Sequence, residues 1–316
     1  MITPEISEKL SLLSAKYEAM GQDINSYLDG LLYADYLTYW HYIHLDTLLT
    51  LQTPRTSFED ESIFIMYHQI TELNFKLVLH AMRQICDAMP LQTAEFVKQL
   101  QRMNSYFKML INSFEIMIDG MDKEQFLRFR MALLPASGFQ SAQYRMIELF
   151  ATDIDKLIAK QHRDQINYDN EIAAILPYLY WKQGANELAT GKKTLTLRQF
   201  ELKYDEEFIR IINDHKHKNL YARYRTLSDE EQKNEELIAQ MRLFDHQANV
   251  MWPLMHYRSA VRYLNRNPNV IAATGGSNWQ KYLPPQHQHI IFFPELWTQE
   301  EKNEWGKKTE INQLPK

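Results

Sequence analysis

The residues with the clearest chemical potential lie in the run FRMALLPASGFQSAQYR, from Phe129 to Arg145. An arginine, a Pro-Ala-Ser-Gly break and two glutamines stand here between two helical patterns, where a structural helix would carry Leu, Glu and Lys. Arg130 has an apolar setting beside Phe126 and Phe129, and a buried arginine requires a carboxylate partner. We interpret Arg130 as a clamp for a ligand carboxylate. An internal ion pair with one of the 40 acidic residues is the alternative.

His68 has a setting in which an imidazole could act on a ligand. It lies four residues after Phe64, so the two side chains share a helix face, which Thr71 and Phe75 continue. A neutral imidazole beside an aromatic ring can accept from, or donate to, a polar N–H in an apolar pocket. The alternative is a core histidine satisfied by Glu72 at i+4, and the sequence alone leaves both open.

His256 stands in the run MWPLMHYR and shares a helix face with Trp252, Ser259 and Tyr263. One imidazole among flat apolar side chains is typical of a heme iron ligand. A lone histidine on an aromatic, methionine-lined face is also typical of a protein core. The spacing does not distinguish these two interpretations.

Other segments give weaker signals. The loop Thr274-Gly-Gly-Ser277 offers backbone N–H groups and a hinge that could close over a charged ligand, although an ordinary turn would look the same. Two histidine pairs have a spacing that could bind a metal ion on a strand, but such short motifs produce many false matches. We interpret them as solvated histidines: His215 with His217, and His287 with His289.

Composition narrows the class of protein. A net charge of -5 argues against a nucleic-acid partner, because phosphate binding requires concentrated Lys and Arg. Cys86 is the single cysteine, which excludes an intramolecular disulfide and a cysteine-based metal site. No apolar stretch approaches the ~20 residues that cross a bilayer. We therefore expect a cytoplasmic protein with neither a nucleic-acid nor a membrane partner.

Helical spacing of apolar residues recurs along the whole chain, and only nine of 316 residues are glycine. Strand signals are nearly absent, so the sequence predicts an all-α protein. We expect one helical domain over residues 1–316, in which 163–204 is a possible insertion without a functional interpretation. With Thr93 and Asp122 as N-caps, the predicted helices span about 5–20, 59–87, 93–118, 122–134, 140–161, 205–217 and 228–265.

Taken together, the motifs resemble those of one family, the tryptophan 2,3-dioxygenases. The resemblance covers roughly residues 35–300, and its SGFQSxQYR element is highly specific. The family carries the following elements in the same order: Tyr39-x-x-Tyr42-x-x-Leu45-Asp46, Phe64-x-x-x-His68-Gln-x-x-Glu72-Leu, the run from Phe129 to Arg145, His256, the TGGS loop and Phe293-Pro-Glu-Leu-Trp297.

The resemblance implies a fold and an activity. The fold would be a helical bundle of the tryptophan/indoleamine dioxygenase type, with heme b buried between long helices. Members of the family form homotetramers. They insert both atoms of O2 across the C2–C3 bond of the indole of L-tryptophan, giving N-formylkynurenine, so L-tryptophan and O2 are the implied partners.

The resemblance also implies a role for each site residue. His256 looks like the proximal iron ligand. His68 looks like the distal catalytic residue, a hydrogen-bond partner of the indole N–H rather than an obligatory base. The other matches are Phe64 on the substrate ring, Arg130 and Phe126 at its carboxylate, Thr274 at its amino-acid end, Tyr39 and Tyr42 from a neighbouring subunit, and Ser137 and Gly138 against the heme.

Three positions depart from the family pattern: Asn74 replaces the usual Trp, Phe126 a Tyr, and Ala273 a Gly. The interval from His256 to Thr274 is also longer than in the family. The hydroxyl missing at Phe126 would weaken carboxylate binding by about 0.5–1.5 kcal/mol. One alternative is therefore a heme dioxygenase that acts on a different indole or aromatic substrate. A heme-binding sensor or a catalytically silent scaffold is a second alternative, although it would have no reason to retain both the arginine and the TGGS loop.

Overall fold

Helices account for the regular structure of the described part of the chain. The computed structural model describes residues 2–34, 38–133, 140–168, 170–183, 185, 192–264 and 284–307. Within these ranges there are α-helices, short 3-10 turns, a π-helical turn and an isolated bridge between Ile158 and Leu179, but no strand. The predicted all-α class is confirmed.

The chain divides into two compact units, Met1–Thr53 and Pro54–Lys316. The expectation of a single domain over 1–316 stays a prediction. In the first unit, Thr3 caps the helix predicted over 5–20, and Pro4 occupies its first turn. None of the described residues of this unit is buried. Its helices are α1 (Pro4–Ala19), α2 (Ile24–Tyr33), α3 (Tyr39–Tyr42) and α4 (Leu45–Leu48).

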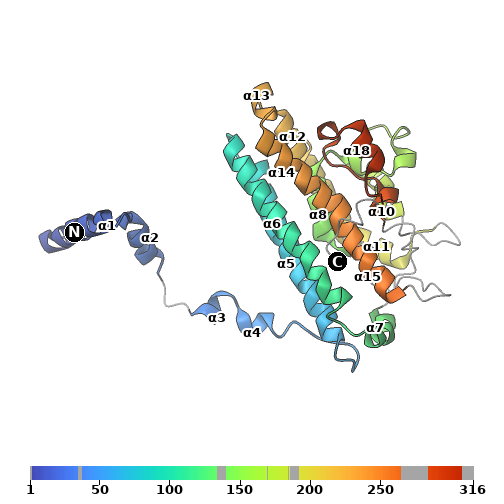
Figure 1. Ribbon diagram of the computed structural model, residues 1–316, viewed down its shortest axis with the longest axis horizontal. Coiled ribbons are helices and arrows are strands. Elements are labelled where there is room, and N and C mark those ends of the chain that lie inside the picture. Colours follow the sequence, from blue (N-terminus) through green and yellow to red (C-terminus); the bar gives the residue numbers. More distant parts are fainter. Residues whose placement is uncertain are drawn as a thin grey trace. The chain divides into compact units, whose positions relative to one another are not determined.

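The core of the second unit forms between long helices that run side by side (Figure 1). On α5 (Glu61–Cys86) and α6 (Thr93–Ile118), buried apolar residues recur every three or four positions, which places them on one face of each helix. The two helices are antiparallel. α14 (Glu235–His246) and α15 (Trp252–Leu264) form one long run that packs along α6.

Three of the predicted helices have other bounds in the structure, partly because of contacts with distant parts of the chain. The helix predicted over 140–161 ends early as α8 (Ala142–Ala151), because Thr152 is extended and its hydroxyl donates to the Phe292 carbonyl at 2.6 Å. The helix predicted over 205–217 begins ten residues earlier as α11 (Leu195–His215), where the Thr194 side chain caps it. The helix predicted over 228–265 is broken into α13 (Asp229–Gln232), α14, a π-helical turn and α15.

The two predicted N-caps have different outcomes. Asp122 caps α7 (Lys123–Phe129) as predicted, since its carboxylate accepts the Gln125 N–H at 2.8 Å. Thr93 does not cap α6: it is the first helical residue, and its hydroxyl donates to Glu231 at 2.8 Å. The remaining elements are η1 (Arg130–Leu133), η3 (Ile154–Leu157), η4 (Lys160–His162), α9 (Ile172–Ile175), η5 (Leu176–Tyr178), α10 (Tyr180–Gln183), α12 (Leu220–Arg225), α13 (Asp229–Gln232), η6 (Gln247–Met251), α17 (Pro285–Gln288), η7 (Pro294–Leu296) and α18 (Gln299–Glu304).

The single cysteine lies at the end of α5 and is part of the core. Cys86 is buried among apolar side chains. Burial raises the pKa of its thiol to about 12. No helix in the described part of the chain is both long and apolar enough to cross a membrane.

A buried arginine joins α8 to α10. The Arg145 guanidinium donates to the Glu148 carboxylate at 2.8 Å and to the Tyr180 hydroxyl at 3.0 Å. It also lies 5.4 Å from the Trp181 ring. Burial alone would lower the pKa of Arg145, but the Glu148 carboxylate raises it above its ordinary value. The predicted insertion 163–204 is therefore tied to the core through α10.

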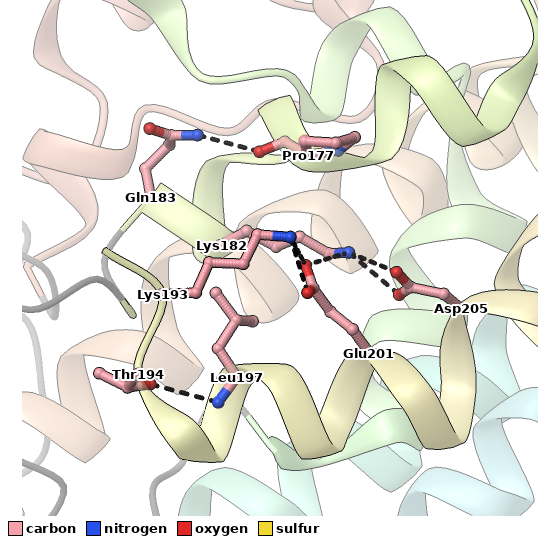
Figure 2. A network of polar contacts seen from close by, with 8 residues as sticks. All are labelled: Pro177, Lys182, Gln183, Lys193, Thr194, Leu197, Glu201 and Asp205. Atoms are coloured by element: carbon pink, nitrogen blue, oxygen red, sulfur yellow. Dashed lines mark hydrogen bonds and ion pairs between the residues drawn. The ribbon is translucent and has the colours of Figure 1, made fainter. Parts of the chain in front are cut away.

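A second buried cation ties α10 to α11, as Figure 2 shows. Lys182 is only 2% exposed, and its ammonium donates to the Glu201 and Asp205 carboxylates at 3.0 Å each. Lys193 donates to the same Glu201 at 2.7 Å. A buried ammonium is tolerated only when such partners are present.

We predict that Lys182→Met lowers the free energy of unfolding by about 1–3 kcal/mol, because it removes the Lys182 donor from the partly buried Asp205 carboxylate and leaves Glu201 with Lys193 alone. Urea unfolding measures this change. The matched control is Lys98→Met, which removes an exposed lysine from its pair with Glu95 and is expected to change little. Equal effects of the two variants would show that burial of Lys182 does not matter.

Candidate functional site

His68 is held in one tautomer by its own helix. Its Nδ1 lies 2.7 Å from the Phe64 carbonyl oxygen. A carbonyl oxygen can only accept, so Nδ1 carries the proton and Nε2 keeps a lone pair. Glu72, the partner considered in the alternative interpretation, instead accepts from the Gln143 amide at 2.8 Å. His68 therefore presents an acceptor nitrogen.

The His68 imidazole is surrounded by protein without being sealed from solvent. Its side chain is accessible, yet burial lowers the pKa of the imidazole, and the Phe64 carbonyl and the Glu72 charge oppose this shift only in part. The imidazole is therefore neutral near pH 7, and a neutral Nε2 can accept a hydrogen bond from a ligand N–H.

His256 projects from α15 into the same aromatic region. Burial, and to a smaller extent the nearby His68, lower the pKa of His256 to about 4. The centroid of its ring is 6.1 Å from that of Phe114, which is 5.7 Å from that of Tyr67. The Tyr67 ring is 5.3 Å from His68. A series of ring contacts thus joins the two imidazoles.

The face that carries His256 is the one predicted from sequence. Trp252 packs on Phe114 with centroids 4.6 Å apart, and Ser259 and Tyr263 are buried on the same side of α15. Among the residues that the structure describes, no hydrogen bond to the His256 ring is found. A neutral imidazole among flat apolar groups has the donor chemistry of a heme iron ligand. The residues present therefore fit a heme.

Phe64 lies between His68 and the aromatic residues of α7. Its ring centroid is 4.1 Å from that of His68, 6.1 Å from that of Phe126 and 5.8 Å from that of Phe129. Arg130 follows directly, is 4% exposed, and has its pKa lowered by burial. The structure thus brings the phenylalanines together beside His68, and the buried Arg130 follows the last of them in the chain.

Reciprocal hydrogen bonds hold α7 against the start of α5. The Asp60 carboxylate accepts the Asp122 N–H at 2.5 Å, and the Gln125 side chain accepts the Asp60 N–H at 3.1 Å. These bonds join residues that lie more than 60 positions apart in the sequence. They fix the position of Arg130, which follows the last turn of α7, relative to Phe64.

The other predicted site residues lie elsewhere or outside the description. Tyr39 and Tyr42 belong to the first unit, and both are exposed. Ser137, Gly138 and Thr274 lie outside the described residues. The structure therefore gives no arrangement for the Ser-Gly turn or the TGGS loop.

The histidine pairs do not form a metal site in the described part of the chain. His215 is half-buried, and its Nδ1 donates to the Ile211 carbonyl at 3.0 Å. His289 Nε2 donates to the Lys302 carbonyl at 2.9 Å. No group of three or more metal-ligating side chains is found among the described residues.

Two surface hollows lie away from the candidate site. One, of about 530 Å³, is lined by residues that include Pro90, Arg223 and Glu231. The other, of about 380 Å³, is lined by residues that include Arg242, Trp297 and Trp305. Neither contains a predicted site residue, so they have no part in the site.

Sequence reasoning missed Phe114 and Tyr67. Phe114 contacts Tyr67, Trp252 and His256, and so connects three helices. Both residues lie at ordinary core spacing, which resembles any buried helix face. Only the pairing of α5 with α6 and of α6 with α15 shows that these rings separate two histidines.

The fold and site define a class: an all-α protein in which long helices bring two neutral imidazoles, a group of phenylalanines and a buried arginine together. Comparison with known proteins supplies the family. The profile of tryptophan 2,3-dioxygenases matches residues 29–275. The chain therefore belongs to the tryptophan 2,3-dioxygenase family.

Individual members of the family are similar over different lengths. Proteins named tryptophan 2,3-dioxygenase from Ruegeria sp. and Ruegeria pomeroyi are 42% and 35% identical, over 37% and 47% of this chain. These matches span 42% and 54% of the two relatives, about half of their length. The protein of that name from Polaromonas naphthalenivorans is 27% identical over 83% of this chain and 90% of its own length.

Asn74, where the family usually has Trp, leads to a prediction on stability. Its side-chain N–H donates to the Ile70 carbonyl of its own helix at 3.0 Å, while its buried oxygen has no partner among the described residues. We predict that Asn74→Leu leaves the free energy of unfolding unchanged or raises it, because an unsatisfied buried group costs about 1–3 kcal/mol.

The matched control is Asn104, which is equally buried and also has an unpartnered oxygen. Its amide, however, donates to the Gln240 carbonyl and side chain on α14, at 3.0 and 2.7 Å. Asn104→Leu should lower the free energy of unfolding in urea by about 1–3 kcal/mol. A loss of similar size for Asn74→Leu would show that its oxygen has a partner in solution.

Proposed function

We propose that this chain is a heme-dependent dioxygenase that cleaves the indole C2–C3 bond of L-tryptophan with O2 to give N-formylkynurenine. Membership of the family supports this activity, as do the names of the relatives. The observation that carries the proposal is the pair of neutral imidazoles, His68 and His256, joined through aromatic rings on three helices.

In this proposal heme b is held by His256, with Phe114 and Trp252 beside that imidazole. When bound, ferrous heme would supply the iron at which O2 binds and reacts. By resemblance, Ser137 and Gly138 would lie against the heme. The role of the protein is then to orient an electron-rich indole and to exclude water from it.

His68, Phe64 and Arg130 would orient the substrate. The free Nε2 of His68 accepts the indole N–H, a contact that needs no removal of the proton. The Phe64 ring packs against the indole. Arg130 is proposed to hold the substrate carboxylate, because a guanidinium can pair with both oxygens where an ammonium cannot. By resemblance, Thr274 is proposed to contact the amino-acid end of the substrate.

Because Phe126 stands where the family has a tyrosine, the proposed carboxylate site has no tyrosine hydroxyl at this position. Its ring packs on Tyr263 with centroids 4.5 Å apart. The Tyr263 hydroxyl already donates to the Met117 carbonyl, so it does not replace the missing group. Selectivity for the amino-acid end of the substrate would therefore depend mainly on Arg130 and Thr274.

The proposed working form is a cytoplasmic homotetramer. The described part of the first unit contains no buried residue but exposes many apolar side chains, which are typical of surfaces that bind another chain. Tyr39 and Tyr42 are proposed to enter the site of a neighbouring subunit. The exposed apolar residues that support assembly are Leu31, Leu32, Tyr33, Trp40, Leu49 and Leu51 in this unit and Met66, Ile70, Leu73 and Leu77 along α5.

The experiment that tests the activity follows product absorbance when the heme-loaded, reduced protein receives L-tryptophan in air. We expect N-formylkynurenine to form. We also expect His256→Ala to lose the Soret band and His80→Ala to keep it. Faster turnover of an indole without the amino-acid end would support the alternative substrate class. If the protein shows a Soret band but forms no O2-dependent product from any indole, the result would support a heme-binding sensor or a catalytically silent scaffold. A wild-type protein without a Soret band would refute heme binding.

We predict that Arg130→Leu raises KM for L-tryptophan by about 10- to 150-fold, since a hydrogen bond to a charged group contributes about 1.5–3 kcal/mol. The control is Arg128→Leu, two residues earlier on α7, where the guanidinium lies 5.9 Å from the centre of the Phe58 ring. Steady-state kinetics should show normal KM for the control. The clamp role would be rejected if both variants raised KM equally.

A further inference from the structure

The helical run that carries His256 contains one irregular turn. Between α14 and α15, residues Gln247–Met251 are π-helical, and the Trp252 N–H donates to the Gln247 carbonyl five residues earlier. An α-helix bonds to the residue four positions earlier, so a turn of this type accommodates one additional residue. π-helical turns of this kind occur frequently at functional sites.

The additional residue decides which side chains of α15 face α6. One residue corresponds to a rotation of about 100° in an α-helix. Leu237, Met241 and Phe244 form the inner face of α14, and Ala248 continues it into the turn. A regular helix would continue that face through Met251, Met255, Arg258 and Arg262. With one extra residue, the face continues instead through Trp252, His256, Ser259 and Tyr263.

The structure has the second arrangement. Trp252 and His256 contact Phe114, and Ser259 and Tyr263 are buried. Arg258, in contrast, lies 3.7 Å from the half-exposed Glu115 carboxylate at the edge of the bundle. The π-helical turn is therefore what brings the imidazole, and not an arginine, against Phe114, while Met255 is buried in the same apolar cluster.

Pro253 and Tyr144 favour the π-helical hydrogen-bond pattern. In that pattern the residue five positions after Ala248 is Pro253, which has no N–H to donate. The Tyr144 hydroxyl of α8 takes its place and donates to the buried Ala248 carbonyl at 2.8 Å. In a regular α-helix the proline ring would clash with the Asn249 carbonyl. Tyr144 thus satisfies the one acceptor that the proline leaves unpaired.

Asp245 connects the turn to the segment near the C-terminal end. Its fully buried carboxylate accepts from the Asn249 amide inside the turn at 2.8 Å. It also accepts the N–H groups of Phe292 and Phe293 at 2.9 and 3.1 Å, and the Trp297 indole N–H at 3.0 Å. Four donors from two segments thus meet at one side chain.

We propose that Tyr144 and Asp245 are positioning residues that hold the π-helical turn and thereby direct His256 toward Phe114 and His68. Neither touches the imidazole in the structure; each acts through the turn. The inference rests on the proposed function, in which His256 binds the heme iron. In this inference, two motifs that do not touch His256 help to hold it in place. They are the segment Phe293-Pro-Glu-Leu-Trp297, through Asp245, and Tyr144 of the SGFQSxQYR element.

The test is Tyr144→Phe in the full-length, heme-loaded protein, with two measurements: the rate of heme transfer to excess apomyoglobin and the iron–histidine stretching band of the ferrous protein. Loss of the hydroxyl should speed heme transfer by about 5- to 150-fold, which corresponds to 1–3 kcal/mol for an unpaired buried carbonyl. It should also shift the iron–histidine stretching band. Asp245→Asn should act in the same direction.

The matched control is Tyr224→Phe, because the Tyr224 hydroxyl also donates to a backbone carbonyl, that of Gln232, at 2.9 Å. It should leave both measurements unchanged. Adding Pro253→Ala to Tyr144→Phe returns an N–H to the Ala248 carbonyl and should restore slow heme transfer. An unchanged band in both Tyr144→Phe and Asp245→Asn, in a protein whose wild type binds heme through His256, would overturn the inference. A wild type that binds no heme would instead overturn the proposed function.

Discussion

The contact of the Phe114 ring with rings from two other helices is the interaction on which the site depends. Phe114 of α6 packs on Tyr67 of α5 and on Trp252 and His256 of α15. Because interiors are close-packed, this ring fixes the separation of the two histidine-bearing helices. Burial lowers the pKa of both imidazoles, so both are neutral near pH 7.

Charged groups are placed where partners surround them. Arg145 and Lys182 are both deeply buried, yet each lies against carboxylates and the ring of Trp181. These cations join α8, α10 and α11, and so connect the segment 163–204 to the core. The centre between the histidines has no comparable ion pair among the described residues. The buried ion pairs thus lie away from the histidines, and the region between the histidines is apolar.

The sequence predicted the long helices well because their apolar spacing is regular. Glu61–Cys86 and Thr93–Ile118 closely match the predicted ranges, and the face that joins Trp252 to His256 was evident from spacing alone. The ends of α8 and α11 could not be predicted, because they depend on the Thr152 contact with Phe292 and on the Thr194 cap. The π-helical turn was also missed, since one of the contacts that favour it comes from Tyr144, more than 100 positions away.

The site could be assembled only in part from sequence. The proximity of Phe64 to His68 followed from helical spacing, and the apolar setting of Arg130 from its neighbours Phe126 and Phe129. The bond between Asp60 and Asp122 that brings α7 to α5 has no local signal, because it joins two ordinary helix starts. Thr274, Ser137 and Gly138 stay predictions.

The burial of Cys86 has a consequence for a protein that handles O2. Oxidation of cysteine proceeds through the thiolate, at rates that follow thiolate character and exposure. Cys86 is sealed within the core and its raised pKa keeps it as the thiol. Since it is the chain's single cysteine, the folded protein presents no reactive sulfhydryl for sulfenic acid formation or for disulfide crosslinks between copies. Oxidative inactivation must therefore begin at other side chains or after unfolding.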